Sequence, residues 1–186
     1  LAGTNVKEVI SVSATEIVVV ADRADAATGD VRLVANTGGR VISSGGFTYN
    51  TEGAILSATP SSGQHGAEIT IYGVSLFGHG PAIATVTLNG NVAAILEQND
   101  LFVTVVVPPG AAGVGDIVVT STSSAYITFE DGWQYVPVGA ITQVDPSSGQ
   151  TGSIVEIRGN NLLGGAPGLT EVLLAGIPAS VLDFSN

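Results

Sequence analysis

The chain has 186 residues, of which 45% are hydrophobic and only 11% are charged, and its formal net charge is −11 at pH 7. Its 5 lysines and arginines are too few to neutralise a run of phosphates, which excludes nucleic-acid binding and disfavours an anionic membrane surface. Cysteine is absent, which excludes disulfides, thiolate nucleophiles and cysteine metal sites. The most apolar stretch, residues 101–120, is interrupted by Pro108, Pro109 and Asp116, so we expect no membrane-spanning segment in the chain.

Taken in chain order, the residues predict short strands separated by turns, with no clear helical stripe. The first clear strand covers residues 16–20. Apolar and polar residues alternate over residues 69–72 and again over 155–158, as on a strand with one buried face. Ile117 and Val119 are expected to face inward in the same way. Turns rich in glycine or proline punctuate these strands at 60–66, 77–81, 89–91, 108–115 and 131–132.

The chain repeats itself at an offset of 86 residues. Residues 55–100 align with residues 141–186 without a gap, and 17 of the 46 pairs are identical. The densest match is Pro-Ser-Ser-Gly-Gln, which occurs at 60–64 and at 146–150. An internal repeat of this kind indicates tandem copies of one structural unit.

The same offset also relates the first part of the chain to the middle part, for example Gly-Phe-Thr-Tyr at 46–49 to Gly-Trp-Gln-Tyr at 132–135. The repeat therefore predicts three domains. They are the C-terminal part of one module at residues 1–50, a complete module at 51–138, and the N-terminal part of a third module at 139–186.

The complete repeat carries a recognisable pattern. Residues 55–73 read Ile-x4-Pro-x2-Gly-x2-Gly-x2-Ile-x-Ile-x-Gly, and a Val-x-Leu-x-Gly strand and turn follows at 86–90, before a closing aromatic strand that ends at Tyr135. This pattern resembles the IPT/TIG domain, the immunoglobulin-like fold shared by plexins and Rel-type transcription factors. The resemblance implies an all-β protein made of tandem immunoglobulin-like (IPT/TIG, early-set type) antiparallel β-sandwiches. The family occurs in receptor ectodomains, cell-surface arrays, starch-acting enzymes and DNA-binding factors, and the low positive charge excludes the last of these.

The connections between modules are short. Tyr49 to Ile55 and Tyr135 to Ile141 span the two joints at equal length, and Pro137 restricts the backbone of the second. A tyrosine beside a joint can pack its amphipathic ring on the next module. We therefore predict that Tyr49, Tyr135, Pro137, Ile55 and Ile141 form stiff joints between modules packed end to end.

Residues with reactive side chains are few. His65 and His79 lie in glycine-rich turns, and their counterparts in the third repeat are Thr151 and Gly165. The sequence contains no Gly-x-Ser-x-Gly elbow, His-Glu-x-x-His motif or phosphate-binding loop. We therefore predict that the chain is not an enzyme and has no catalytic residue and no cofactor.

Three carboxylates, Asp22, Asp25 and Asp30, lie within nine residues, and oxygen ligands of this kind suit Ca²⁺. The EF-hand pattern is absent, and the matching loop of the complete module keeps only Asp116. The recurrence of Asp30 and Asp116 favours a shared structural role in capping a turn. We therefore predict no metal ligand.

Asn-x-Ser/Thr sequons are missing, whereas serine and threonine together number 33. This composition leaves O-linked glycans as optional covalent partners. The candidate acceptors are Ser121, Thr122, Ser123 and Ser124.

Together these observations predict a non-enzymatic structural protein, extracellular or at the cell surface, that is a segment of a tandem IPT array forming a filament, stalk or adhesive fibre. Its partners would be neighbouring modules or identical subunits in a homopolymer, and the split end modules could complete one another between subunits. Two alternatives stay open. One is the ligand-binding ectodomain of a plexin-like cell-surface receptor, and the other is an accessory module of a polysaccharide-acting enzyme.

Overall fold

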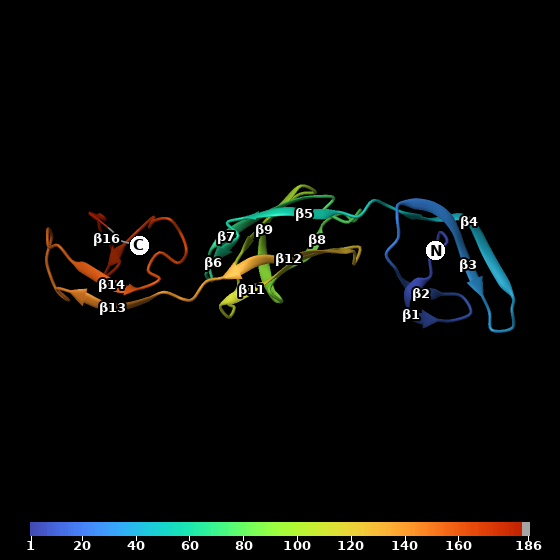
Figure 1. The fold of residues 1–186 in the computed structure, drawn as a ribbon, viewed down its shortest axis with the longest axis horizontal. Helices are drawn as coiled ribbons and strands as arrows, with labels where there is room; N and C mark the ends of the chain where they lie inside the picture. The colour runs from blue at the N-terminus through green and yellow to red at the C-terminus, as the bar shows by residue number, and fades with distance from the viewer. Residues whose placement is uncertain (184–186) are drawn as a thin grey trace. The chain divides into compact units, whose positions relative to one another are not determined.

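The computed structural model describes residues 1–183, and every regular element in that range is a β-strand. The chain divides into two compact units, Leu1–Glu52 and Gly53–Asn186 (Figure 1). Within residues 1–183 no helix is long and apolar enough to cross a membrane. Positions 184–186 of the predicted third module lie outside the described residues.

The first unit consists of two antiparallel strand pairs. β1 (Val6–Val12) pairs with β2 (Ile17–Ala21), and β3 (Ala27–Val34) pairs with β4 (Arg40–Tyr49). The turn between β1 and β2 is held by Ser13, whose Oγ accepts hydrogen bonds from the backbone N–H groups of Thr15 and Glu16, at 3.3 and 2.9 Å.

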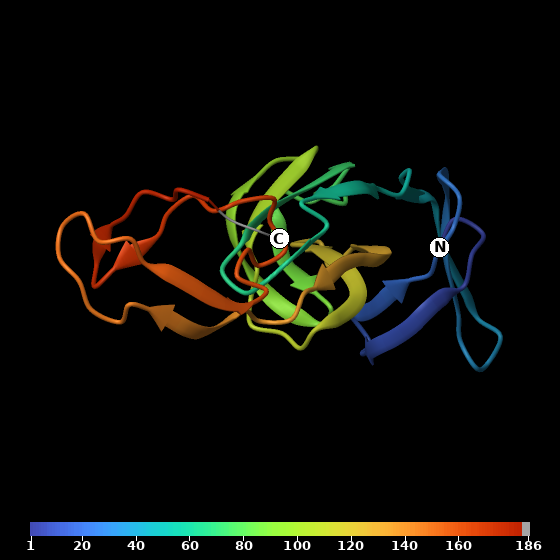
Figure 2. The same ribbon diagram turned by 60° about the vertical axis from the view of Figure 1, so that its left-hand side comes forward.

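The second unit begins with a complete sandwich, called the middle module below. Its eight strands follow the order β5-β7-β10-β9-β8-β11-β12-β6. The sheet folds over so that β5 lies against β12, and Figures 1 and 2 show the strands in two facing layers. The strands are β5 (Ala54–Thr59), β6 (Ser62–Gly63), β7 (Glu68–Val74), β8 (Ile83–Leu88), β9 (Asn91–Gln98), β10 (Phe102–Val106), β11 (Gly113–Ser121) and β12 (Tyr126–Tyr135).

Period-2 alternation places one face of each long strand in a shared core. Ile69 and Ile71 on β7, like Ile117 and Val119 on β11, are at most 1% exposed, which confirms the inward positions expected from the sequence. All hydrophobic residues that are buried within residues 1–183 lie between Ile55 and Tyr135. The middle module is therefore an all-β sandwich with a core of its own, and the predicted fold class is confirmed.

The remainder of the second unit, called the third segment below, has short strands and exposed apolar residues. It contains β13 (Ala140–Asp145), β14 (Glu156–Asn160), β15 (Leu173–Leu174) and β16 (Ile177–Pro178). β13 pairs with β14, and β15 pairs with β16, both antiparallel.

One turn geometry recurs in all three parts of the chain. In the middle module, the turn between β8 and β9 has positive φ at Asn89 and Gly90, of 47° and 78°. The corresponding turns have φ of 45° and 90° at residues 2–3, and of 50° and 81° at residues 175–176. Such a pair of left-handed residues matches the twist of a two-residue hairpin, and glycine at the second position removes the steric cost.

The recurring aspartates hold an equivalent pair of contacts. Oδ1 of Asp116 accepts a hydrogen bond from the N–H of Asp131 at 2.9 Å, and Oδ1 of Asp30 accepts one from the N–H of Gly45 at 3.0 Å. The backbone N–H groups of Asn89 and Ala2 donate to the carbonyls of these same two aspartates, at 2.8 and 2.9 Å. Asp30 and Asp116 thus share a structural role, but each bonds across to its partner strand at a β-bulge and does not cap a turn as the sequence had indicated.

A candidate inter-module joint

The site begins where the chain leaves the last strand of the middle module. β12 ends beside β6, and the N–H groups of Gln134 and Val136 donate to the carbonyls of Ser61 and Gly63, both at 3.0 Å. These bonds bring the residue that follows β6, Gln64, next to the start of the connection.

Gln64 then reaches across that connection. Its Oε1 accepts a hydrogen bond from the N–H of Gly139 at 3.2 Å, and the bond is partly buried. A second contact runs the other way, since Nδ2 of Asn161 in the third segment donates to the carbonyl of Pro137 at 3.5 Å. The linker is therefore held at two points by side-chain amides, one from each side.

A glycine turn of the third segment packs closely on the same residues. A Cβ atom added to Gly164 would lie 2.8 Å from Nε2 of Gln64, and one added to Gly165 would lie 3.4 Å from Val136. Both glycines also have positive φ, of 62° and 86°, which other residues adopt only with strain. A side chain at Gly164 would therefore need the end of the Gln64 side chain to move, in addition to adopting a positive φ.

Gly139 is constrained as well. A Cβ at this position would lie 2.4 Å from the carbonyl oxygen of Asn161. Gly53, which lies 86 residues earlier, has the same constraint, because its Cβ would lie 2.4 Å from the carbonyl oxygen of Ser75. Gln64 likewise has an identical counterpart in Gln150. Gln64 and Gly139 therefore have identical counterparts in the repeat, as does Gly164 in Gly78, whereas the other contact residues do not recur.

We call the residues Gln64, Val136, Pro137, Gly139, Asn161, Gly164 and Gly165 the joint. Its polar contacts use neutral amides and backbone groups, and none of these residues is ionisable. These residues supply hydrogen bonds and close packing between the third segment and the middle module.

The two tyrosines predicted at joints pack inside their own units. Tyr135 is 2% exposed, and its ring meets Trp133 edge-on with the centroids 5.7 Å apart. Its ring also covers Gly110, where an added Cβ would lie 2.5 Å from Cζ. This burial raises the pKa of the Tyr135 phenol. Tyr49 repeats the aromatic contact with Phe47 at 5.0 Å.

The other three predicted joint residues differ in burial. Ile55 belongs to the middle module's core and is 8% exposed, whereas its counterpart Ile141 is 62% exposed. Pro137 is exposed and contributes its carbonyl to the bond from Asn161.

The four predicted glycan acceptors do not share one environment. Ser121 is 3% exposed, and its hydroxyl donates to the carbonyls of Phe77 and Ala82. The folded module therefore does not offer Ser121 to a modifying enzyme, because the strand ends there and the loop after β7 covers it. Thr122, Ser123 and Ser124 are exposed.

The histidines and the N-terminal aspartates do not gather into a centre. His65 lies within 3.1 Å of the carbonyl of Val107 through Nδ1, and His79 is exposed at a φ of 60°. Among residues 1–183, no group of three or more His, Asp or Glu side chains is arranged to hold a metal ion.

Sequence reasoning missed Gln64, Gly139, Asn161 and Gly164. The available signal was the identity of Gln64 with Gln150, together with that of Gly53 with Gly139. A Gln in a Pro-Ser-Ser-Gly-Gln turn was interpreted only as part of that turn, although it also reaches the next module.

The strand order, the core and the recurring turns define an immunoglobulin-like sandwich module. Residues 54–132 match the IPT/TIG domain family, so the middle module is an IPT/TIG domain, as the sequence pattern predicted. The match covers less than half of the chain. No curated protein matches the sequence.

Several solved structures are similar to the chain. A putative phosphatase from Bacteroides thetaiotaomicron is 24% identical, with 50% of this chain and 19% of the other covered at a TM-score of 0.41. The extracellular region of plexin A4 is 16% identical, with coverages of 70% and 12% and a TM-score of 0.45. A Bacteroides ovatus SGBP-B from a mixed-linkage glucan utilization locus, solved with a heptasaccharide, is 16% identical, with coverages of 76% and 38% and a TM-score of 0.40. This chain spans only a minor part of each, and similarities this low do not bear on what it binds.

Proposed function

We propose that the chain is a non-catalytic segment of an extracellular tandem array of IPT/TIG modules, and that the array forms a stalk, filament or adhesive surface fibre. The observation that supports this proposal is the joint, in which Gln64 binds Gly139 while Gly164 and Gly165 pack on Gln64 and Val136. A stiff stalk or fibre requires neighbouring modules to keep their relative orientation, and the two hydrogen bonds of the joint restrict the linker.

The proposal extends the joint to the whole array. Because Gln150 and Gly53 repeat Gln64 and Gly139, each module carries one half of a joint at each end. Stability in such an array is the sum of module terms and nearest-neighbour terms. The low charge of the chain agrees with surfaces that face other modules.

The test is Gln64→Ala, with Gln134→Ala as the matched control, since Gln134 is an exposed residue of the same module. We expect amide exchange at Gly139 to accelerate by up to about ten-fold in the first variant, because one net hydrogen bond is worth about 0.5–1.5 kcal/mol. Residual dipolar couplings should then report a wider range of orientations of the third segment. Unchanged exchange and couplings in Gln64→Ala would contradict the joint.

Electron microscopy of the native material tests the array itself. Extended rods or fibres with a regular repeat are expected. Dispersed monomers of a single module length would overturn the proposal.

A second candidate function is ligand binding by the outer face of the β5-β7-β10-β9 layer. Tyr72 is 46% exposed and lies opposite Phe102 with the ring centroids 6.4 Å apart, while the hydroxyls of Thr70 and Thr104 lie 3.1 Å apart beside them. At the positions of Tyr72 and Phe102 the other copies carry Arg158 and Glu16, so this patch is specific to the middle module.

An aromatic face flanked by hydroxyls suits a sugar ring, as a receptor ectodomain or an accessory module of a polysaccharide-acting enzyme would require. The test is a titration of the full chain with soluble oligosaccharides, followed by NMR. We expect shifts at Tyr72 and Thr104 that disappear in Tyr72→Ala and persist in Tyr126→Ala, since Tyr126 is exposed on a different strand. If no oligosaccharide shifts these signals, this candidate function is contradicted.

A further inference from the structure

The first unit and the third segment expose apolar side chains that the middle module buries. Residues 86 positions apart differ strongly in exposure although both are apolar. The pairs are Leu33 at 40% against Val119 at 0%, Ile141 at 62% against Ile55 at 8%, and Leu169 at 41% against Ile83 at 4%.

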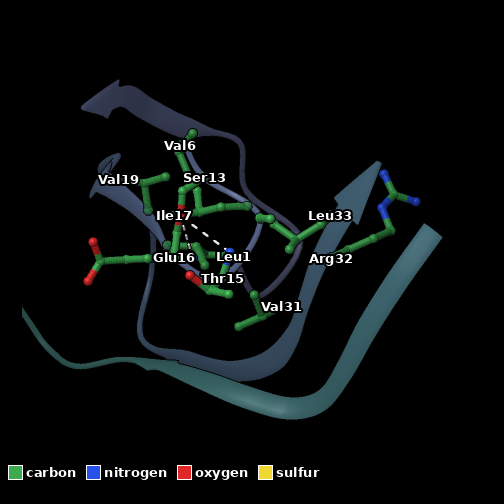
Figure 3. A pocket seen from close by; sticks show the side chains of 11 residues that line it. Leu1, Val6, Ser13, Thr15, Glu16, Ile17, Val19, Val31, Arg32 and Leu33 are labelled. Carbon is green, nitrogen blue, oxygen red and sulfur yellow. Dashed lines mark hydrogen bonds between the residues drawn. The ribbon is translucent and has the colours of Figure 1, made fainter. Parts of the chain in front are cut away.

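In the first unit these side chains surround a cavity. It has a volume of about 440 Å³ and is lined mainly by apolar residues of β2, β3 and the chain start, among them Leu1, Ile17, Val19, Val31 and Leu33 (Figure 3). In the middle module the strands equivalent to β2 and β3 pack against β7 and β8. The first unit contains no strand equivalent to β7 or β8, because it consists only of β1–β2 and β3–β4.

The third segment contains the strands that the first unit lacks. β14 lies 86 residues after β7, and residues 169–174 lie 86 residues after the main part of β8. Among residues 1–183, β14 pairs only with β13, so the edge that β7 offers to β10 is open in β14. Open edges of this kind are templates for pairing with another chain.

We propose that the third segment of one copy completes the sandwich of the first unit of a second copy, with β14 added beside β2 and residues 169–173 added beside β3. The inference rests on the proposed function, of which it names the partner: a second copy of this chain. It is a form of strand addition, in which backbone hydrogen bonds give affinity and alternate side chains give specificity.

The middle module supplies the register of the docked strands. Val103 lies opposite Ile71, Val105 opposite Ile69, and Val119 opposite Val86, and all six are at most 1% exposed. In each pair, the first residue has a counterpart 86 positions earlier in the first unit, and the second has one 86 positions later in the third segment. These counterparts are apolar throughout. They are Ile17 with Ile157, Val19 with Val155, and Leu33 with Val172.

The outward positions in this register are complementary in charge. Glu16 falls opposite Arg158, where the middle module has Phe102 and Tyr72. Arg32 is the counterpart of Val118, and Glu171 is the counterpart of Thr85. In the middle module Val118 lies opposite Thr87, two residues after Thr85, so Arg32 falls diagonally across from Glu171. Two of the 5 basic residues of the chain thus meet acids of the other copy, at positions where the complete module carries no charge.

The two copies overlap at one hairpin. Leu1 and Leu174 both occupy the place of Leu88, since each precedes the same left-handed turn. The first unit already supplies this turn and β1, so the docked segment ends at Leu173. The β15–β16 pair, which has only two residues in each strand, opens when the segment docks.

The test uses two single-cysteine forms of the full chain, Glu16→Cys and Arg158→Cys, one of them tagged. The chain has no cysteine of its own, and both positions are exposed, so the variants should fold. Opposed residues in an antiparallel pair have Cα atoms within about 5.5 Å, which a disulfide spans, whereas diagonal residues are about 7–8 Å apart. Mixed oxidised chains should therefore give a disulfide-linked heterodimer.

The matched control replaces Arg158→Cys with Glu156→Cys, which lies on the same face of β14 two residues away. We expect a clear excess of heterodimer for Glu16→Cys with Arg158→Cys over Glu16→Cys with Glu156→Cys. Equal yields, or no heterodimer with either partner, would overturn the proposal.

Charge reversal gives a second readout in chains without cysteine. Sedimentation should show association that weakens about five-fold or less in Glu16→Arg, as expected for an exposed ion pair, and recovers when Glu16→Arg is mixed with Arg158→Glu. A chain that stays monomeric at all concentrations would overturn the proposal. That result would leave the Gly139 exchange test of the joint unaffected, so the two failures are distinguishable.

Discussion

Trp133 and Phe47 lie 86 residues apart on corresponding strands, and each packs edge-on against a tyrosine two residues later. Trp133 is fully buried, whereas Phe47 is only partly buried. The local sequence and the local contacts are alike, so the difference comes from the strands that face them. The middle module has eight strands around one core, and the first unit has two separate pairs. Burial in this fold is thus a property of the complete strand set.

The strongest test of this difference in burial is to truncate the corresponding isoleucine in the middle module and in the third segment. Ile71→Ala removes a side chain that is 0% exposed and should cost the middle module about 2–5 kcal/mol of its free energy of unfolding. Ile157→Ala, at the corresponding position, removes a half-buried side chain and should cost less than about 1 kcal/mol.

Urea unfolding measures both variants, at a dilution where the chain is monomeric. Fluorescence of Trp133, the single tryptophan, reports the middle module, and amide exchange reports the third segment. Equal losses in the two variants would show that the third segment has a core as well packed as that of the middle module.

The recurring aspartates test a feature that the two modules share, since their hydrogen bonds are alike in a complete and an incomplete module. Asp116→Ala removes the bond to the N–H of Asp131 and should cost the middle module about 1 kcal/mol. Asp30→Ala should weaken the β3–β4 pairing near Gly45 by a similar amount, as measured by amide exchange at Gly45. Glu130→Ala is the control, because it is an exposed neighbour. A loss in only one module would mean that the shared bond differs in strength.

The buried tyrosine makes the middle module sensitive to high pH. Burial raises the pKa of Tyr135 in the folded state, so folding favours the neutral phenol. The stabilisation is present below the ordinary tyrosine pKa of about 10 and is lost as the pH rises through the higher folded-state value. Urea midpoints should therefore fall less in Tyr135→Phe than in the parent chain above about pH 10. Tyr72→Phe, at an exposed residue, should behave like the parent chain.

The smallest effect is expected at the surface of the first unit. Arg23 and Glu52 form an ion pair of 2.7 Å, but their side chains are 84% and 53% exposed. Glu52→Gln should change the stability of this unit by less than about 0.5 kcal/mol, as measured by thermal unfolding. A larger loss would mean that charge, and not strand pairing, holds the incomplete unit together.

Patterns of identity and alternation were enough to predict most of the fold. Ile69, Ile71, Ile117 and Val119 face inward as their alternation indicated, because a strand with one buried face leaves that signature in any sequence. The family followed from glycines and prolines, which mark turns independently of context.

The joint was harder to predict, because distance along the chain does not give the direction of a side chain. Tyr135 is next to the linker, yet its ring lies in the core, while Gln64 lies 75 residues from Gly139 and binds it. Ser121 shows the same limit. It was predicted among the glycan acceptors, but the loop that buries it comes from residues 77–82.

The joint's lack of charge has a consequence for the medium in which such modules work. Salt weakens ion pairs at a protein surface, since ions in solution screen them within about 8–10 Å at moderate ionic strength. The bond from Gly139 to Gln64 and the glycine packing around it are neutral and are not screened in this way. We therefore expect the contacts of this joint to depend little on salt concentration.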